Sequence, residues 1–174
     1  MGRIRPILIL GVAIGTAGGA GFVPKAPGTA GAAVAVAGFA LASHLGLSFL
    51  AHIAIVFALS GVGVWASGVC EVAFSNHDDG RIVIDEVAGQ WIALLPLLAL
   101  SDSSWAMWGL VTGFVAFRLF DIAKPGPVSW AERRFEGGLG VMADDLVAGV
   151  IAAGVVALFV ALVSNGSLSG GGIA

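Results

Sequence analysis

Charged residues are scarce in this chain of 174 residues. Lysine, arginine, aspartate and glutamate together make up 11% of the sequence, whereas a soluble domain carries about 25%. Hydrophobic residues make up 58%, and this composition excludes a water-soluble globule. Acidic residues outnumber basic residues by 11 to 8, so the chain lacks the basic surface that a nucleic-acid partner requires.

Cysteine is nearly absent, whereas glycine is abundant. Cys70 is the only cysteine, which excludes an internal disulfide and a cysteine metal centre, and we expect it to be a small buried apolar residue. Many of the 27 glycines lie inside apolar runs, as is typical of membrane helices whose backbones approach closely. The sequence therefore predicts an all-α fold, a polytopic membrane helical bundle.

The apolar runs predict about five transmembrane helices, because a span needs roughly 17 to 25 mostly apolar residues. The candidate spans are residues 30–46, 49–69, 84–100, 104–122 and 145–163. Glycines soon interrupt the apolar run of residues 1–23, so we expect an interfacial or re-entrant segment there rather than a sixth span or a cleaved signal peptide. We predict one membrane-embedded catalytic domain over residues 1–163 and a flexible Ser/Gly-rich tail over 164–174.

The positions of the charges predict the orientation of the chain in the membrane. With the N-terminus inside, residues 1–29, 70–83 and 123–144 are cytoplasmic, and all 8 basic residues lie in or beside these regions, as the positive-inside rule requires. Of the 11 acids, all except Asp102 lie on the same side. Because that rule does not require acids there, we expect a polar site on the cytoplasmic face.

Five carboxylates mark the cytoplasmic ends of three predicted spans. Asp85 and Glu86 open the third span, Asp121 closes the fourth, and Asp144 and Asp145 open the fifth. Ionisable groups are costly in a membrane and are normally paired or functional, and carboxylate oxygens are ligands for Mg²⁺. We predict that these residues bind Mg²⁺ and supply the catalytic groups. Helix capping and i,i+3 ion pairing are the structural alternatives for single members.

The basic residues near these acids predict an anionic ligand. Lys25 lies in a loop of prolines and glycines before a predicted helix, where backbone N–H groups can approach a phosphate, although a simple cap by Thr29 is an equal alternative. Arg118 and Lys124 lie one turn before and one turn after Asp121 and add cationic partners. The predicted phosphate-binding residues are Lys25, Pro27, Gly28, Thr29, Arg118 and Lys124.

Two readings from different functional classes follow from these residues. A phosphate ester held by Mg²⁺ at the cytoplasmic membrane surface fits the acids and bases together. A membrane cation transporter or channel is the alternative, since acids also line ion paths. Against it, the acids gather at one interface and the outer halves of the predicted spans are nearly free of ionisable groups.

Four segments resemble the sequence blocks of the phosphatidylglycerophosphatase A family, in the family's order and spacing. They are residues 24–31, 82–92, 117–125 and 137–149. The chain departs from the family pattern at Ala32, where many members have serine, and at Gly126, where an aromatic residue is common. The resemblance implies a Mg²⁺-dependent enzyme of the bacterial inner membrane. Its active site would face the cytoplasm and hydrolyse phosphatidylglycerophosphate to phosphatidylglycerol and inorganic phosphate.

Two hydrolytic mechanisms remain open for such an enzyme. In the first, carboxylates hold one or two Mg²⁺ ions that activate a water, with Glu86 or Asp121 as general base. In the second, one aspartate attacks the phosphorus and forms an aspartyl-phosphate. The four blocks contain no cysteine or histidine to act as another nucleophile, and we favour the first mechanism.

Overall fold

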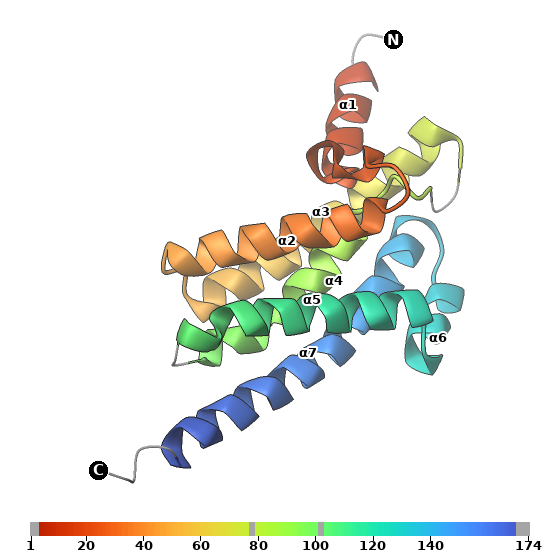
Figure 1. Cartoon of the computed structure of the whole chain (residues 1–174). Coiled ribbons are helices and arrows are strands. Elements are labelled where there is room, and N and C mark those ends of the chain that lie inside the picture. The colour runs from red at the N-terminus through yellow and green to blue at the C-terminus, as the bar shows by residue number, and fades with distance from the viewer. Residues whose placement is uncertain (1–3, 77–78, 101–102, 170–174) are drawn as a thin grey trace.

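The computed structural model describes residues 4–76, 79–100 and 103–169, and it contains no strand within those ranges. Figure 1 shows the helices, and the all-α prediction is confirmed. The elements in chain order are α1 (Ile4–Gly15), η1 (Ala17–Phe22), α2 (Pro27–His44), α3 (Phe49–Phe74), α4 (Ile84–Leu94), η2 (Leu95–Ala99), η3 (Ser103–Trp105), α5 (Ala106–Ala123), α6 (Gly126–Arg134) and α7 (Gly137–Ser169). Asp102 lies outside the described residues.

Among the residues that the structure describes, three helical segments are long and apolar enough to cross a membrane. They are Phe49–Phe74, Ser103–Ala123 and Gly137–Asn165. The predicted span at 84–100 is instead the 11-residue α4, about 17 Å long at 1.5 Å per residue, followed by the short 3₁₀ helix η2. Pro96 lies in η2, and a proline cannot supply the N–H that would continue the α-helix. The membrane character is therefore confirmed, while the count of five spans stays a prediction.

The N-terminal segment is a short helix that packs on α3. α1 has 12 residues, about 18 Å, which is less than the roughly 30 Å of a bilayer core, as expected for a segment that does not span. The N–H of Val83 donates to the carbonyl of Gly15 at 2.8 Å. The end of α1 thus holds the residue immediately before α4.

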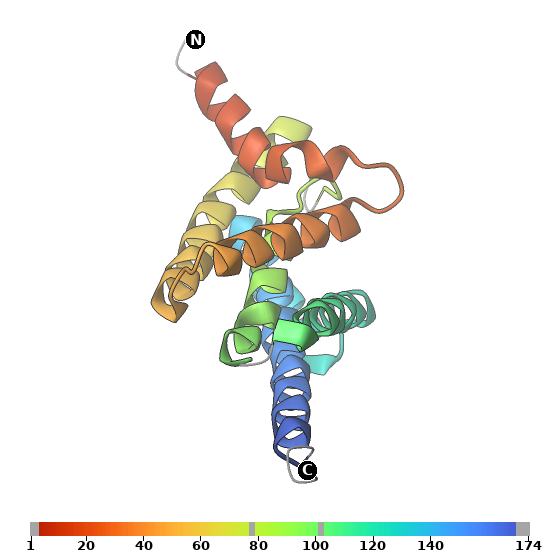
Figure 2. The ribbon, with the colours of Figure 1, turned by 60° about the vertical axis from the view of Figure 1, so that its left-hand side comes forward.

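α4 is the central helix of the fold. It contacts α2, α3, α5 and α7, and 9 of its 11 residues are buried. Figure 2 shows it in the middle of these helices. A Cβ added at Gly89 would overlap the carbonyl of Asp145, and one added at Gly149 would lie 2.9 Å from the Gly89 carbonyl carbon. Glycine at both positions therefore lets the backbones of α4 and α7 touch.

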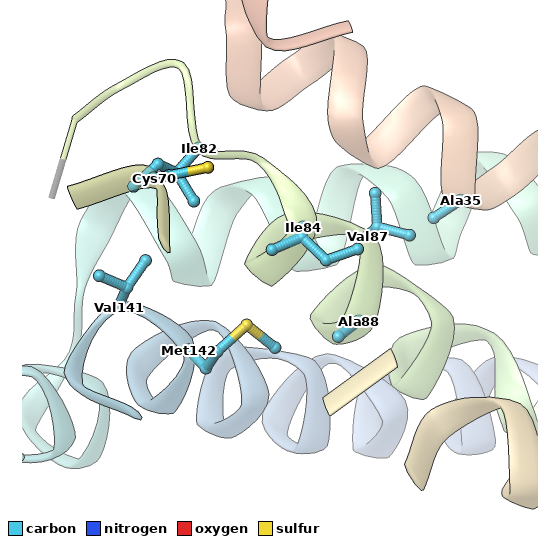
Figure 3. Close-up of a cluster of buried hydrophobic side chains, with 8 residues drawn as sticks. All are labelled: Ala35, Cys70, Ile82, Ile84, Val87, Ala88, Val141 and Met142. Carbon is cyan, nitrogen blue, oxygen red and sulfur yellow. The ribbon is translucent and has the colours of Figure 1, made fainter. Parts of the chain in front are cut away.

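An apolar cluster fixes the beginning of α4 against its neighbours (Figure 3). Its members come from α2, α3, α4 and α7 and from the segment before α4. They are Ala35, Cys70, Ile82, Ile84, Val87, Ala88, Val141 and Met142. Cys70 is fully buried among them, as predicted. This cluster places the first turn of α4 beside the early turns of α7.

α7 begins earlier than the predicted fifth span. Residues 136–140 are rich in glycine, as many loops are, but the chain is helical from Gly137 onward. The reason is packing, because a Cβ at Gly138 would lie 2.9 Å from the Gly68 backbone nitrogen of α3. The helix runs to Ser169, and residues 170–174 of the predicted tail lie outside the described residues.

Candidate active site

Three carboxylates, two of them buried and the third half-buried, meet where α4 contacts α7. One oxygen from each of Asp85, Glu86 and Asp145 lies within 4.8 Å of the other two. Asp85 and Glu86 occupy the first turn of α4, whereas Asp145 follows two turns inside α7. We call these three residues the carboxylate trio. Asp145 is therefore too far from the helix start to be explained as a capping residue.

The carboxylate trio has Arg118 beside Glu86 as its cationic partner among the described residues, and one guanidinium cannot balance three carboxylates. The acids Asp121, Glu86 and Asp144 all interact electrostatically with Asp145, and like charges in a low dielectric repel strongly. Oε2 of Glu86 and Oδ1 of Asp145 are buried and have no hydrogen-bond partner among the described residues. Unpaired carboxylate oxygens from converging helices are the donor set that a hard divalent cation such as Mg²⁺ takes. The residues therefore fit the expected metal.

Arg118 on α5 links Asp121 to the carboxylate trio. Its Nη1 forms an ion pair with Asp121 and lies 3.7 Å from Oε1 of Glu86. The i,i+3 pair expected for Asp121 is thus present, and it also holds Asp121 beside the trio. Nε of Arg118 is buried without a hydrogen-bond partner among the described residues. This N–H is a cationic donor available to an anion.

Lys124 pairs with Asp144, which does not belong to the carboxylate trio. Its Nζ donates to Oδ2 of Asp144 at 2.9 Å and to Oε1 of Glu132, on α6, at 2.5 Å. Partial burial alone would lower the pKa of Lys124, but the bonds to these two carboxylates raise it above its ordinary value. The ammonium group stays charged at neutral pH. Sequence reasoning missed Glu132, because its spacing from Lys124 crosses the turn between α5 and α6 and matches no helical pattern.

The start of α2 lies directly against the charged groups. Gly28 is buried, and a Cβ added there would overlap the carboxylate of Glu86 and lie 3.0 Å from Nη1 of Arg118. Only glycine leaves room for these side chains beside the helix. The alternative role of Thr29 as a simple helix cap is wrong, since the N-cap is Ala26 and forms no side-chain hydrogen bond. Pro27 stands at the first turn, where proline suits a helix start.

Lys25 lies near this helix start but not among the buried groups. It has a left-handed backbone conformation (φ 69°), its side chain is exposed, and it forms no ion pair with any other residue that the structure describes. The charged side chains of Asp79 and Arg81 also stay apart from the trio, since they bind each other at 2.6 Å. The bonds from Arg81 lower the pKa of the Asp79 carboxyl. Neither residue belongs to the candidate site.

One further polar residue adjoins the trio and was missed in the sequence. Gln90 is fully buried and follows Glu86 by four residues in α4, so both side chains point to the same helix face. That spacing was a usable signal.

Comparison with known proteins shows the family to which the chain belongs. The sequence model of the family described as Phosphatidylglycerophosphatase A matches residues 13–160. The chain is similar to a Bacteroides thetaiotaomicron protein provisionally named a phosphatidylinositol-3-phosphatase, with 43% identity over 81% of this chain and 87% of that protein. It is also similar to phosphatidylglycerophosphatase A of Escherichia coli K12 (38% identity, 79% and 76% covered) and of Haemophilus influenzae (36%, 86% and 85%). No solved structure matches the chain.

Proposed function

The chain belongs to the phosphatidylglycerophosphatase A family, and from this premise we propose that it hydrolyses phosphatidylglycerophosphate to phosphatidylglycerol and inorganic phosphate. The observation that carries the proposal is the carboxylate trio with the guanidinium of Arg118 beside it. Acids that could hold a metal and a cation that could hold a phosphate lie together at the ends of membrane helices. A lipid phosphate monoester is the substrate class that needs both.

Asp85, Glu86 and Asp145 are the residues that would hold Mg²⁺. They offer only oxygen donors, and the two buried oxygens without partners on Glu86 and Asp145 give the ion places to bind. When bound, Mg²⁺ neutralises charge on the phosphoryl oxygens and lowers the pKa of a water ligand. Oxygen-only ligands favour Mg²⁺ over Zn²⁺, which prefers nitrogen and sulfur.

Arg118 and the start of α2 would bind the terminal phosphate. The free Nε–H of Arg118 supplies a charge-assisted hydrogen bond, and its ion pairs with Glu86 and Asp121 hold the guanidinium in place. Gly28 brings the first turn of α2, with its free backbone N–H groups, next to the same guanidinium. Lys124 adds a fixed positive charge nearby. A preorganised set of donors of this kind stabilises the charge that develops during phosphoryl transfer.

Asp121 is the residue we assign as general base. Its carboxylate lies beside the trio without belonging to it, so it stays available when the trio binds the metal. The attacking water transfers a proton to the Asp121 carboxylate as its oxygen bonds to phosphorus. The bond from phosphorus to the glycerol oxygen breaks, and that oxygen takes up a proton from solvent to leave as a hydroxyl of phosphatidylglycerol. Arg118 orients Asp121 for this step through their ion pair.

We place the site on the cytoplasmic side of the bacterial inner membrane. The start of α2, the end of α3, the end of α5 and α6 lie on one side of the molecule (Figure 1). These segments, with the loop before α4, include Lys25, Arg81, Lys124, Arg133 and Arg134. Such clustering of basic residues supports a cytoplasmic location under the positive-inside rule.

The test is release of inorganic phosphate by the purified protein in detergent micelles. We expect release from phosphatidylglycerophosphate, its loss with EDTA and its return with added Mg²⁺. Phosphatidylinositol-3-phosphate is the comparison substrate, because the relative in Bacteroides thetaiotaomicron is named for that lipid. Release of phosphate only from the inositol lipid would show that this lipid, and not phosphatidylglycerophosphate, is the substrate. No release from either lipid, together with Mg²⁺-dependent cation flux in liposomes, would replace the phosphatase with a transporter.

A further inference from the structure

Gln90 is a buried polar residue that the chemistry above does not use. Its side chain is 0% exposed, and neither Nε2 nor Oε1 has a hydrogen-bond partner among the described residues. Burying an amide without hydrogen bonds destabilises a protein. An apolar residue of the same size would avoid that cost, so the amide is best explained by a partner that comes from outside the chain.

The surroundings of Gln90 place that partner between a charged layer and an apolar layer. Glu86 lies one turn away on the same face of α4, about 6 Å toward the cytoplasmic end. On the other side, Ala93 packs in a cluster of small or apolar residues from α2, α4, α5, α6 and α7. The cluster consists of Ala32, Ala93, Ala116, Phe117, Val128, Ala148 and Ala152. None of these side chains can hydrogen-bond an amide.

The position of Gln90 matches one group of the proposed substrate. In phosphatidylglycerophosphate the terminal phosphate is joined to the phosphodiester by a glycerol unit whose central carbon carries a free hydroxyl. If Arg118 binds the terminal phosphate and the acyl chains lie in the membrane, this hydroxyl falls about one helical turn deeper than the phosphate. A hydroxyl both donates and accepts, so it can satisfy Oε1 and Nε2 together. A phosphodiester only accepts.

We propose that Gln90 recognises this hydroxyl and makes the site specific for a lipid phosphate that carries it. Nε2 donates to the hydroxyl oxygen, and Oε1 accepts the hydroxyl proton. Gln90 is thus a specificity residue in contact with the part of the substrate that does not react. The inference rests on the proposed function, whose substrate contains this group.

The experiment compares two substrates and two forms of the enzyme. The substrates are phosphatidylglycerophosphate and an analogue in which the CH–OH of the connecting glycerol is CH₂. We expect wild-type kcat/KM to be at least about tenfold higher for the hydroxyl substrate, since a site built to bind a hydroxyl discriminates against its absence. Gln90→Met, which is close in volume, should lower kcat/KM about tenfold for the hydroxyl substrate and less than twofold for the analogue. The preference should then disappear.

Matched variants separate recognition from folding. Gln90→Leu is a second apolar replacement and should behave like Gln90→Met. Thr112→Val is the control, because it removes a hydroxyl from α5 away from the site, and it should leave kcat/KM for both substrates within about twofold of wild type. Thermal unfolding in the same detergent reports whether each variant is folded. Equal losses on both substrates in a folded Gln90 variant would overturn the inference, because a residue that only supports the trio affects both alike. Equal wild-type kcat/KM values for the hydroxyl substrate and the analogue would also overturn the inference. If the wild type hydrolysed neither substrate, the proposed function itself would be wrong.

Discussion

The close contact between α4 and α7 predicts that one added methyl group will damage catalysis more than stability. In Gly149→Ala, the new Cβ would lie 2.9 Å from both the carbonyl carbon and the Cα of Gly89. These are backbone atoms of a buried helix, so no side chain can move aside. The two helices must separate or slide by a few tenths of an ångström or more.

The stability change is a difference between two opposing terms. Alanine is favoured over glycine in a helix by roughly 1 kcal/mol, whereas overpacking a tight core costs about 1 to 3 kcal/mol. The net loss is then at most about 2 kcal/mol. The catalytic effect is larger, because Asp145 lies one turn from Gly149 while Asp85 and Glu86 lie on the other helix. A misplacement of about 1 Å between catalytic groups can lower the rate about 100-fold.

The assay is kcat for phosphate release in detergent, with the thermal unfolding midpoint measured on the same preparation. Gly154→Ala is the matched control, because Gly154 lies in the same helix and a Cβ there meets nothing within 4 Å. It should keep full activity and gain stability. A folded Gly149→Ala enzyme with near wild-type kcat would refute the reasoning, since it would show that the geometry between α4 and α7 does not control the trio.

Three other predictions concern the charged groups. Asp145→Asn should abolish thermal stabilisation by Mg²⁺ and nearly all turnover. Asp144→Asn removes a partner of Lys124 rather than a member of the trio, so it should retain stabilisation by Mg²⁺. Equal effects of the two variants on Mg²⁺ binding would contradict the assignment of Asp145, and not Asp144, to the trio. Arg118→Lys keeps the positive charge but loses the Nε–H and the planar guanidinium geometry, so kcat/KM should fall about 100-fold or more. A fall of less than about threefold would show that Arg118 does not bind the phosphate. The folded-state pKa of Lys124 is raised, so the stability that Lys124 contributes is complete below its unfolded pKa and is lost only as pH rises through the higher folded pKa. The difference in unfolding free energy between wild type and Lys124→Met should therefore stay constant from about pH 7 to pH 9. A decline of that difference within this window would disprove the assignment.

Local sequence patterns predicted much of the fold because membrane segments are constrained by length and polarity. Apolar runs such as 49–69 must form helices, since a lipid environment offers no other partner for backbone N–H and C=O groups. The helix at 84–94 was harder to delimit. Its apolar run continues past Pro96, and hydropathy alone does not distinguish a short buried helix from a span.

Contacts between segments distant in the chain decide what local composition leaves open. Residues 136–140 have the glycine content of a loop, but Gly138 is needed where α7 touches the backbone of α3. Lys25 stays a predicted phosphate-binding residue, and the structure places its exposed side chain outside the group of buried acids. Composition describes what a segment can do by itself, whereas its neighbours decide which of those possibilities occurs.

By itself the sequence determined a helical membrane protein whose acids and bases gather at the ends of its helices, because hydropathy and charge act on each segment separately. Only the tertiary structure decided which acids act together. Asp144 and Asp145 are adjacent and chemically identical, but successive residues of a helix are rotated by about 100°. The packing of α4 on α7 turns Asp145 toward Asp85 and Glu86 and leaves Asp144 to Lys124.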